Sequence, residues 1–596
     1  MIKSALASLM LLFCVSLKAQ FTQMDPGIPV FSYGHIAPGD YDNDGDPDLF
    51  ITGENSSLNR AMLYRNDGNW QFTPTAFIFP PFSRGCASWG DFNKDGWLDL
   101  AVSGAFNPNA YPSSFKLYRN LQGQGFEEIP TTLPQVQYSH QVWADVFNDG
   151  NLDLVFQGVV WNAQGAFPHS GIYRNLGNSQ FELLQTNLTP IFNGEIRMAD
   201  FDGDGDLDLA NSGYFEYSYG NFYPAIRVYE SDSGDSFQTV TSLALGGSSG
   251  IDWFDFGNDG DLDLIFCGFD AATGLRSTRI LQNNGSAGFA VMPTAMVGID
   301  MGDVACADYD NDGDNDIFIC GNDSDAHSVA KLYRNEGNGV FSETGDQFTS
   351  VKHSHACWAD LDNDGDLDLM YIGEESLHPN YGDRIRFYRN DQNAANYPPA
   401  YPDLSYSPGA GIVIFPSVDD HTPNQCLSYD LRIGTSPGGA ELLRPMANPV
   451  TGFRRIPEPG RPSFAQYQLA PGTYYLSAQA IDGSWRGSNW GPELMVQTGV
   501  ENAGESISAT ALKLQANPNP FRDQIRIGID AGRQVPVRLE IFNLRGQRIV
   551  VLHEGYLPRG AHSLDWNPDP GLGSGIYLLK LSSGDNSTTL RLGLVK

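Results

Sequence analysis

A nine-residue acidic stretch recurs seven times along this chain, and Asp308–Asp316 shows it most clearly. The copies follow one another at intervals of 51 to 55 residues. A fixed interval of this size indicates a repeat architecture, in which each copy belongs to one structural unit. The seven copies begin at Asp40, Asp91, Asp145, Asp200, Asp255, Asp308 and Asp360.

The spacing of the carboxylates predicts a cation site in each copy. Complete copies have Asp at positions 1, 3, 5 and 9 and Gly at position 6. Alternating Asp residues on a tight loop direct their oxygens at one centre, and hard cations such as Ca²⁺ take six to eight oxygen ligands. Position 7 is expected to add its backbone carbonyl. The complete sets are Asp40, Asp42, Asp44 and Asp48; Asp200, Asp202, Asp204 and Asp208; Asp308, Asp310, Asp312 and Asp316; and Asp360, Asp362, Asp364 and Asp368.

Three copies depart from this pattern at position 3. The second has an amide there, whose oxygen still ligates, whereas the third has Phe147 and the fifth has Gly257. We therefore expect about five strong Ca²⁺ sites and two weaker ones. The alternative is a set of ordinary acidic turns, because Asp and Gly are common turn formers. The remaining expected ligands are Asp91, Asn93, Asp95 and Asp99; Asp145, Asp149 and Asp153; and Asp255, Asp259 and Asp263.

Each repeat also carries short strand-like segments separated by Gly and Asn turns. The segment Leu63–Asn66, with the sequence LYRN, has close counterparts in other repeats. Short strands at even spacing are typical of an all-β β-propeller, and seven repeats predict seven blades. The last repeat lacks a fourth strand. We expect Phe21–Val30 to supply it and so to close the ring.

These repeats resemble the FG-GAP/VCBS repeat family, which is also found in integrin α subunits and some fungal lectins. The resemblance covers about Phe21–Asp391. It implies a seven-bladed propeller with Ca²⁺ in the loop that joins the first and second strands of a blade. Phe147 and Gly257 depart from the family pattern at position 3, so we expect weaker metal binding in those two copies.

The face opposite the acidic loops is the expected ligand-binding face. Aromatic side chains in the loops between second and third strands would stack on sugar rings, and polar groups at the start of the innermost strands would add hydrogen bonds. A catalytic site built from some of these polar groups and a set of merely solvated side chains are the alternatives. The aromatics are Phe106, Tyr111, Trp161, Phe167, Tyr214, Phe215, Tyr217, Tyr219, Phe222, Tyr223 and Tyr381. The polar positions, five residues before each loop, hold His35, Cys86, His140, Glu195, Gly250, Asp303 and His355.

The last third of the chain predicts two small β-sandwich domains. Alternating strand patterns over residues 393–499 resemble a fibronectin type III domain. After a linker at 500–511, residues 512–596 contain PNPF from Pro518, FNLRG from Phe542 and GIYLLKL from Gly575. This order resembles the C-terminal sorting domain of the type IX secretion system of Bacteroidetes, which implies that secretion machinery as a partner. A purely structural terminal domain is the alternative.

The two ends of the chain together predict a secreted or cell-surface protein. Residues 1–19 read as a signal peptide with Lys3 before a short apolar stretch, and residues 20–392 would form the propeller. No later apolar stretch is long enough for a transmembrane segment. The formal net charge of -35 argues against binding nucleic acid. The cysteines show no metal-type spacing, and buried free thiols are favoured over disulfides.

We therefore expect non-enzymatic binding or adhesion, with a glycan or a matrix polymer as the ligand. The first alternative is a polysaccharide-degrading lyase or hydrolase on a propeller scaffold, and the second is a structural surface component. No nucleophile motif, pair of catalytic carboxylates or cofactor fingerprint is evident, so no catalytic residue is assigned.

Overall fold

The structure is a computed structural model that describes most of residues 20–596. It does not describe residues 1–19, 56–57, 106–112, 163–164, 185, 219–220, 233, 235, 338, 376–381, 393–395, 408–410, 465–466, 499–512, 518, 520, 523, 532–534, 558–559, 570 and 584–585. The expected signal peptide and the expected linker at 500–511 therefore lie outside the described residues.

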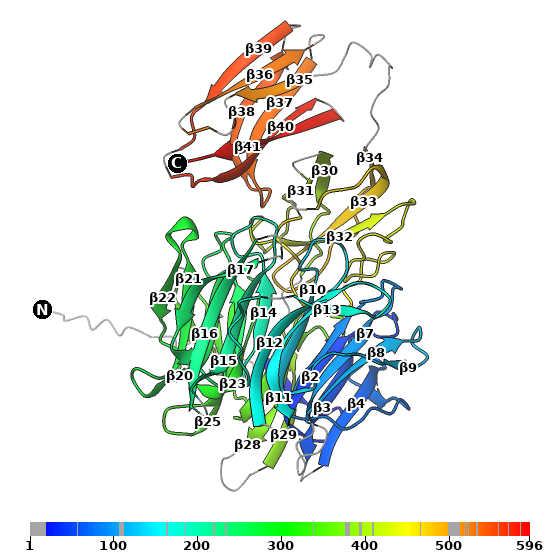
Figure 1. Ribbon diagram of the computed structural model, residues 1–596, viewed down its shortest axis with the longest axis vertical. Coiled ribbons are helices and arrows are strands. Elements are labelled where there is room, and N and C mark those ends of the chain that lie inside the picture. Colours follow the sequence, from blue (N-terminus) through cyan, green and yellow to red (C-terminus); the bar gives the residue numbers. More distant parts are fainter. Residues whose placement is uncertain are drawn as a thin grey trace, which may run out of the picture.

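Seven antiparallel sheets form the larger part of the described chain (Figure 1). Successive strands are neighbours in each sheet, and in the fifth sheet β18 and β19 both pair with β20. The innermost strands β2, β6, β10, β14, β19, β23 and β27 contact one another in that order, and β27 contacts β2. This ring of radially arranged sheets is a β-propeller, as predicted.

The strands of the seven sheets follow in chain order. They are β2 (Ser32–Gly39), β3 (Asp48–Asn55), β4 (Leu58–Asn66) and β5 (Phe72–Pro74); β6 (Ala87–Gly90), β7 (Asp99–Ala105), β8 (Ser113–Asn120) and β9 (Phe126–Ile129); β10 (Val136–Ala144), β11 (Asp153–Asn162), β12 (Gly165–Asn175) and β13 (Phe181–Leu183); β14 (Ile196–Ala199), β15 (Asp208–Ser218), β16 (Asn221–Asp232) and β17 (Ser236–Leu243); β18 (Leu245–Gly246), β19 (Ile251–Phe254), β20 (Asp263–Asp270), β21 (Leu275–Asn283) and β22 (Phe289–Pro293); β23 (Asp300–Ala307), β24 (Asp316–Asn322), β25 (Ser328–Asn335) and β26 (Phe341–Glu343); and β27 (Lys352–Ala359), β28 (Asp368–Glu375) and β29 (Gly382–Asn390).

The first strand of the described chain closes the ring. β1 (Phe21–Met24) pairs antiparallel with β29, and Phe21 lies opposite Asn390. It is the outermost strand of the last sheet, as the sequence predicted. Because β1 pairs at this outer edge, both ends of the propeller sequence contribute to one sheet, which limits exposed sheet edges.

The core lies between the blades. One buried apolar cluster fills each of the seven spaces between neighbouring sheets. The second strands are flanked on both sides, so every residue of β7 and of β24 is buried. Outer strands such as β9 have only partly buried or exposed residues. This gradient explains why the second strands read as almost continuous apolar runs.

Two smaller β-sandwiches follow the propeller. The second domain has a sheet of β30 (Asp403–Ser407) and β31 (Gly411–Phe415) and a sheet of β32 (Ser428–Gly434), β33 (Gly472–Ile481) and β34 (Leu494–Thr498), with one shared core. The third domain packs two sheets around another core. Its strands are β35 (Lys513–Asn517), β36 (Ile525–Ala531), β37 (Val535–Asn543), β38 (Arg548–Leu557), β39 (Gly560–Trp566), β40 (Gly575–Ser583) and β41 (Asn586–Leu594).

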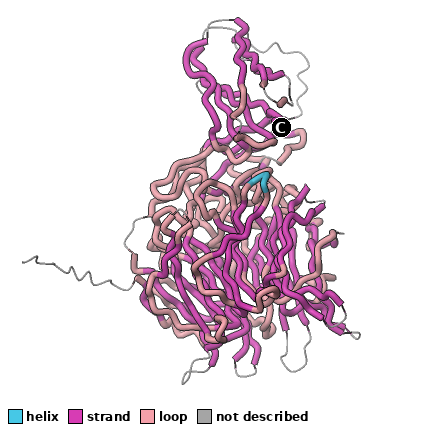
Figure 2. The backbone as a smooth tube through the Cα atoms, turned by 90° about the vertical axis from the view of Figure 1, so that its left-hand side faces the viewer, coloured by secondary structure: helices cyan, strands magenta, loops and turns pink. Residues whose placement is uncertain are grey.

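The described chain is almost free of helix. Its single helical element is a 3₁₀ turn at Gly285–Ala287, shown in cyan in Figure 2. The six cysteines of the described residues are free thiols, and four of them are buried.

Replacing Phe21 tests whether the closing strand stabilises the propeller. Phe21 is 7% exposed, and its ring lies 5.6 Å from that of Tyr309 and 6.2 Å from that of Trp358. We expect Phe21→Ala to lower the free energy of unfolding by about 3–5 kcal/mol, because it leaves a cavity between two blades. Denaturant unfolding measures this loss. Gln23→Ala, at an exposed position of the same strand, should change stability little; equal effects of the two variants would contradict the prediction.

Candidate cation-binding loops and central channel

The seven acidic loops share one backbone conformation. Position 1 follows the innermost strand, and position 9 begins the second strand, as Asp40 and Asp48 do around β2 and β3. Position 4 has a left-handed backbone in every copy, with φ of 58° at Asn43 and 72° at Gly203. Position 6 is Gly with positive φ throughout, for example 97° at Gly45. Asn and Gly adopt this conformation at least cost, which explains their recurrence.

The position 1 carboxylate holds the turn together. The backbone N–H groups of Asp44 and Gly45 donate to the two oxygens of Asp40 at 3.0 and 3.2 Å. The second, third, fifth, sixth and seventh loops repeat both bonds. In the fourth loop only Gly205 donates to Asp200, and Oδ1 of Asp200 is buried without a hydrogen-bond partner.

An asparagine at the end of the third strand links each loop to its surroundings. In the last blade, the backbone N–H of Asn390 donates to Asp368 at position 9, and its side chain donates to carbonyls of Leu367 and of Tyr309 in the neighbouring loop. The recurrent Tyr-Arg-Asn triplet is the sequence signal of this role, which strand patterns alone do not reveal. The equivalent residues that bind position 9 are Asn66, Asn120, Asn175, Asn283 and Asn335, with Ser231 in the fourth blade.

Several loops bring three carboxylates to one centre. In the first, fourth and sixth loops, oxygens from positions 1, 3 and 9 lie within 4.8 Å of one another. One buried position 3 oxygen has no hydrogen-bond partner in each of the first, sixth and seventh loops, at Asp42, Asp310 and Asp362. Buried carboxylate oxygens without partners are costly unless a cation neutralises them. These loops therefore fit a hard, oxygen-preferring cation.

Burial and mutual repulsion raise the pKa values of these carboxyl groups. The pKa of Asp40 rises from 3.8 to about 7, chiefly through burial and then through Asp44 and Asp42. Burial raises the pKa of Asp200 to about 8 and that of Asp360 to about 7, and neighbouring carboxylates add to both shifts. A bound divalent cation would favour the ionised forms and reverse these shifts.

The third and fifth loops have Phe147 and Gly257 at position 3, where the other loops have a carboxylate or an amide. The ring of Phe147 instead lies under the guanidinium of Arg174, at 4.3 Å, and Arg174 pairs with Asp149 at 2.9 Å. In the fifth loop the thiol of Cys426, from the second domain, donates to Asp255 at 3.2 Å. Both loops therefore contain protein groups that satisfy their carboxylates.

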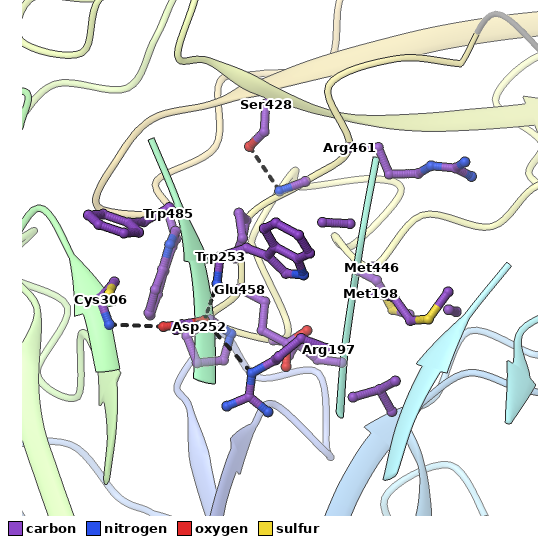
Figure 3. A pocket seen from close by; sticks show the side chains of 18 of the residues that line it. Arg197, Met198, Asp252, Trp253, Cys306, Ser428, Met446, Glu458, Arg461 and Trp485 are labelled. Carbon is purple, nitrogen blue, oxygen red and sulfur yellow. Dashed lines mark hydrogen bonds and ion pairs between the residues drawn. The ribbon is translucent and has the colours of Figure 1, made fainter. Parts of the chain in front are cut away.

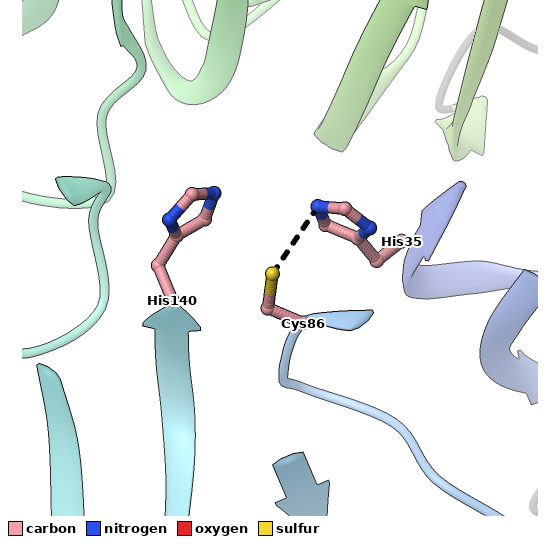
Figure 4. Close-up of side chains that lie close together, drawn as sticks. All are labelled: His35, Cys86 and His140. Atoms are coloured by element: carbon pink, nitrogen blue, oxygen red, sulfur yellow. Dashed lines mark hydrogen bonds between the residues drawn. The ribbon is translucent and has the colours of Figure 1, made fainter. Parts of the chain in front are cut away.

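Four of the residues that lie five positions before a loop line the central channel, namely His35, Cys86, His140 and His355. The rings of His35 and His355 lie 3.7 Å apart, and Nε2 of His35 lies 3.4 Å from Sγ of Cys86, with His140 opposite (Figure 4). Two further residues at this position bind the next blade: Ile251 N–H donates to Glu195 at 3.2 Å, and Ala356 N–H donates to Asp303 at 2.9 Å. Several of the hydrogen bonds that these side chains form therefore connect neighbouring blades.

This channel opens into a cavity of about 460 Å³ whose far wall is the second domain. The sequence predicted that these polar residues lie near the face opposite the acidic loops. The cavity that they line is closed by the second domain on the face that carries the acidic loops. Arg197, the central cation, lies 3.1 Å from Glu195 and 3.7 Å from Asp252 (Figure 3). Glu458 of the second domain is also drawn to Arg197.

The histidine–cysteine pair in the channel does not form an activated nucleophile. Burial lowers the pKa of His35 to about 3 and raises the pKa of the Cys86 thiol to about 12. The pair is therefore a neutral imidazole beside a protonated thiol at neutral pH. A nucleophilic cysteine needs the opposite shifts.

Aromatic side chains gather on the face opposite the acidic loops. Trp161 and Phe167 on the β11–β12 hairpin are 45% and 41% exposed, and Phe222 and Tyr223 on the neighbouring β15–β16 hairpin are 43% and 48% exposed. Tyr214 and Phe215 are half-buried. The side chains of the other expected aromatics, Phe106, Tyr111, Tyr217, Tyr219 and Tyr381, lie outside the described residues.

A strained rim, which the sequence did not reveal, surrounds the channel on this open face. Tyr33, Arg84 and Tyr138, each seven residues before a loop, have positive φ of 48°, 54° and 49°. The guanidinium of Arg84 lies 5.2 Å from the ring centre of Tyr33 and 5.9 Å from that of Tyr138, and it donates to the Tyr138 hydroxyl. Such strain costs roughly 1–3 kcal/mol per residue and is often found at binding sites.

Comparison with known protein families agrees with the repeat and tail assignments. The FG-GAP-like repeat model matches residues 40–102 and 308–371, and the Secretion system C-terminal sorting domain model matches residues 515–594. The chain thus carries FG-GAP-like repeats and a C-terminal sorting domain, which indicates a secreted or outer-surface protein. No match was found among curated proteins. Within the part of the chain that the structure describes, no helix has the length and apolar character needed to cross a membrane.

Three solved structures match the chain at low similarity. A six-bladed lectin from Aleuria aurantia has 10% identity and a TM-score of 0.30, over 59% of this chain and 99% of the lectin. The extracellular domain of the one component system BT4673 from B. thetaiotaomicron has 9% identity and a TM-score of 0.22, over 97% and 99%. A β-fructofuranosidase from Aspergillus kawachii has 9% identity and a TM-score of 0.24, over 96% and 91%. At these scores the likenesses carry no argument about ligand or activity.

The raised pKa values predict an unusual pH dependence for the metal-free protein. Between pH 4 and about 7 to 8, folded carboxyls such as Asp40 and Asp200 bind protons that the unfolded chain has lost. Stability in chelator should therefore rise as the pH is lowered from 8 towards 5. Melting temperatures across this range test the sign. A melting temperature that falls steadily on acidification would contradict it.

Proposed function

We propose that this chain is a calcium-stabilised, non-enzymatic binding protein of the cell exterior, whose ligand is a glycan or a matrix polymer. The main observation behind this proposal is the set of exposed aromatic side chains on the two neighbouring hairpins β11–β12 and β15–β16. The opposite face is unavailable, because the second domain packs on the acidic loops; for example, Ser484 of that domain donates to the Asp308 carbonyl at 2.6 Å. Exposed aromatic surface of this kind is typical of an interaction site.

Calcium is the cation that the loops fit best. The ligand set is oxygen only, the carboxylates converge, and several buried oxygens lack partners. Ca²⁺ accepts this irregular all-oxygen geometry, whereas Mg²⁺ requires near-ideal octahedral sites and retains water. Asp40, Asp42 and Asp48 would hold it in the first loop, and its charge would offset their repulsion.

An enzymatic role has weaker support. The only thiol–imidazole pair among the described channel residues is neutral, and the cavity it faces is covered by the second domain. A polysaccharide lyase or hydrolase would release products from a polymer, whereas a binding protein would retain the polymer unchanged. A structural surface component would do neither.

Substitution of the exposed aromatics tests the binding proposal. Trp161→Ala and Tyr223→Ala should each weaken retention on the bound glycan or matrix polymer at least tenfold, since aromatic stacking would be lost. The measurement is a glycan-array screen followed by affinity titration, with product analysis in parallel. Tyr556→Ala is the matched control, because Tyr556 is 68% exposed but lies in the third domain. Equal affinity of all variants, or product release, would contradict the proposal.

Chelation tests the calcium proposal. At free calcium tenfold above Kd, each site would add about 1.4 kcal/mol to stability. Removing several ions should therefore lower the melting temperature of the purified chain by many degrees, and calcium but not magnesium should restore it. A shift of one or two degrees would refute a structural role for calcium.

A further inference from the structure

Basic side chains of the second domain form ion pairs with the position 1 carboxylate of one acidic loop, the second, and approach several others. The second domain touches the propeller at several loops: Asp40 N–H donates to the Arg455 carbonyl at 2.9 Å, and Asp308 N–H donates to the Gly483 carbonyl at 3.3 Å. These backbone contacts carry no charge. Guanidinium groups of the second domain, in contrast, approach the second, third and fourth loops.

The second loop receives two arginines. Nε of Arg444 lies 3.5 Å from Oδ2 of Asp91, and Nη2 of Arg455 lies 4.0 Å from the same oxygen. The Arg455 side chain is completely buried, and Asp91 is 3% exposed. Arg455 also donates to the carbonyl of Gly96, at position 6 of this loop, at 2.9 Å. A buried guanidinium therefore sits at the position 1 carboxylate.

The third loop is neutralised by three protein cations. Arg461 of the second domain donates to Asn148 at position 4 at 2.9 Å, and it attracts the Asp145 carboxylate. Arg174 pairs with Asp149, as described above. Lys94, which stands where most loops have Asn, is attracted by carboxylates of both the second and third loops and donates to the Leu442 carbonyl at 3.0 Å.

The first, sixth and seventh loops differ at position 1. Among the ion pairs that the structure describes, none joins a basic residue of the second domain to Asp40, Asp308 or Asp360. Elsewhere in these loops, Arg334 of the propeller pairs with Asp310 and Asp312 of the sixth loop at 3.1 and 2.9 Å, and Arg486 of the second domain attracts Asp366 of the seventh.

In the fourth loop Arg461 donates to the Gly205 carbonyl at 2.9 Å and Arg545 of the third domain donates to the Phe201 carbonyl at 3.2 Å. This loop nevertheless keeps four carboxylates and a buried Asp200 oxygen without a partner. In the third loop, every buried carboxylate oxygen has a hydrogen-bond partner. In the second loop, one buried carboxylate oxygen, on Asp99, has no partner.

We propose that calcium binds in the first, fourth, sixth and seventh loops, whereas in the second and third loops arginines of the second domain take the place of the cation. This inference rests on the proposed calcium binding and assigns it to particular loops. A divalent ion beside Asp91 would be repelled by the guanidinium groups 3.5 and 4.0 Å away, and one beside Asp145 would be repelled by Arg461. The two loops thus serve as docking points for the second domain. The fifth loop, with Gly257 and the Cys426 thiol, is assigned to neither group.

Paired substitutions at the same loop position test this division. Asp91→Ala with Asp145→Ala should leave the number of calcium ions bound per chain unchanged. Asp40→Ala with Asp308→Ala, the matched pair, should lower it by two. Calcium per chain is measured on the purified full chain by equilibrium dialysis with elemental analysis. A loss of calcium from the Asp91/Asp145 pair would overturn the proposal.

The unsubstituted chain gives a second measurement that does not depend on the folding of variants. The proposal predicts four calcium ions per chain, or five if the fifth loop also binds one. A count of six or seven would overturn the proposal and leave calcium binding itself intact. A count of one to three would overturn the assignment of the four loops. A count of zero would overturn the proposed calcium binding as well.

Discussion

Carboxylate repulsion within seven small loops is the constraint on which this structure depends. The loops lie where the innermost strand of each blade turns into the second, so their conformation fixes how the two strands pair. Their position 1 carboxylates bind the turn, and all of them except the partly buried Asp360 are buried, for example 1% exposed at Asp40. Burying so many like charges is unfavourable unless cations or protein donors offset them. The proposed cation sites and the contacts of the second domain on this face both offset the negative charge of the loops.

The molecule meets the requirement in two ways. Backbone N–H groups and the third-strand asparagines satisfy part of each loop, and they connect neighbouring blades. The remaining negative charge is offset in one of two ways. Either a cation binds, as the oxygens of Asp42 and Asp310 without hydrogen-bond partners indicate, or arginines of the second domain such as Arg455 approach the loop. The same residues therefore determine blade geometry, domain docking and the proposed metal content.

The two faces of the propeller consequently have different roles. The loop face is covered, and its central cavity is closed by the second domain. The open face keeps the long hairpins with Trp161 and Tyr223 and the strained rim around Arg84. Strand order places the acidic loops and the long hairpins on opposite faces, because consecutive connections of a four-stranded antiparallel blade alternate between its two ends. The sorting domain, which indicates export, lies beyond the covered face (Figure 1).

The sequence by itself determined the repeat, the all-β architecture, the closing strand and the sorting domain, because periodic Asp-Gly loops, alternating strands and fixed motifs are local signals. It also located Phe147 and Gly257 as departures in two loops. It did not determine that Arg455 and Arg461 would lie on the second and third loops, since these contacts join residues more than 300 positions apart. Nor did it reveal the left-handed Tyr33 or the blade-linking role of Asn390. Only the tertiary structure decided these points, because charge neutralisation and backbone strain depend on which distant segments the fold brings together.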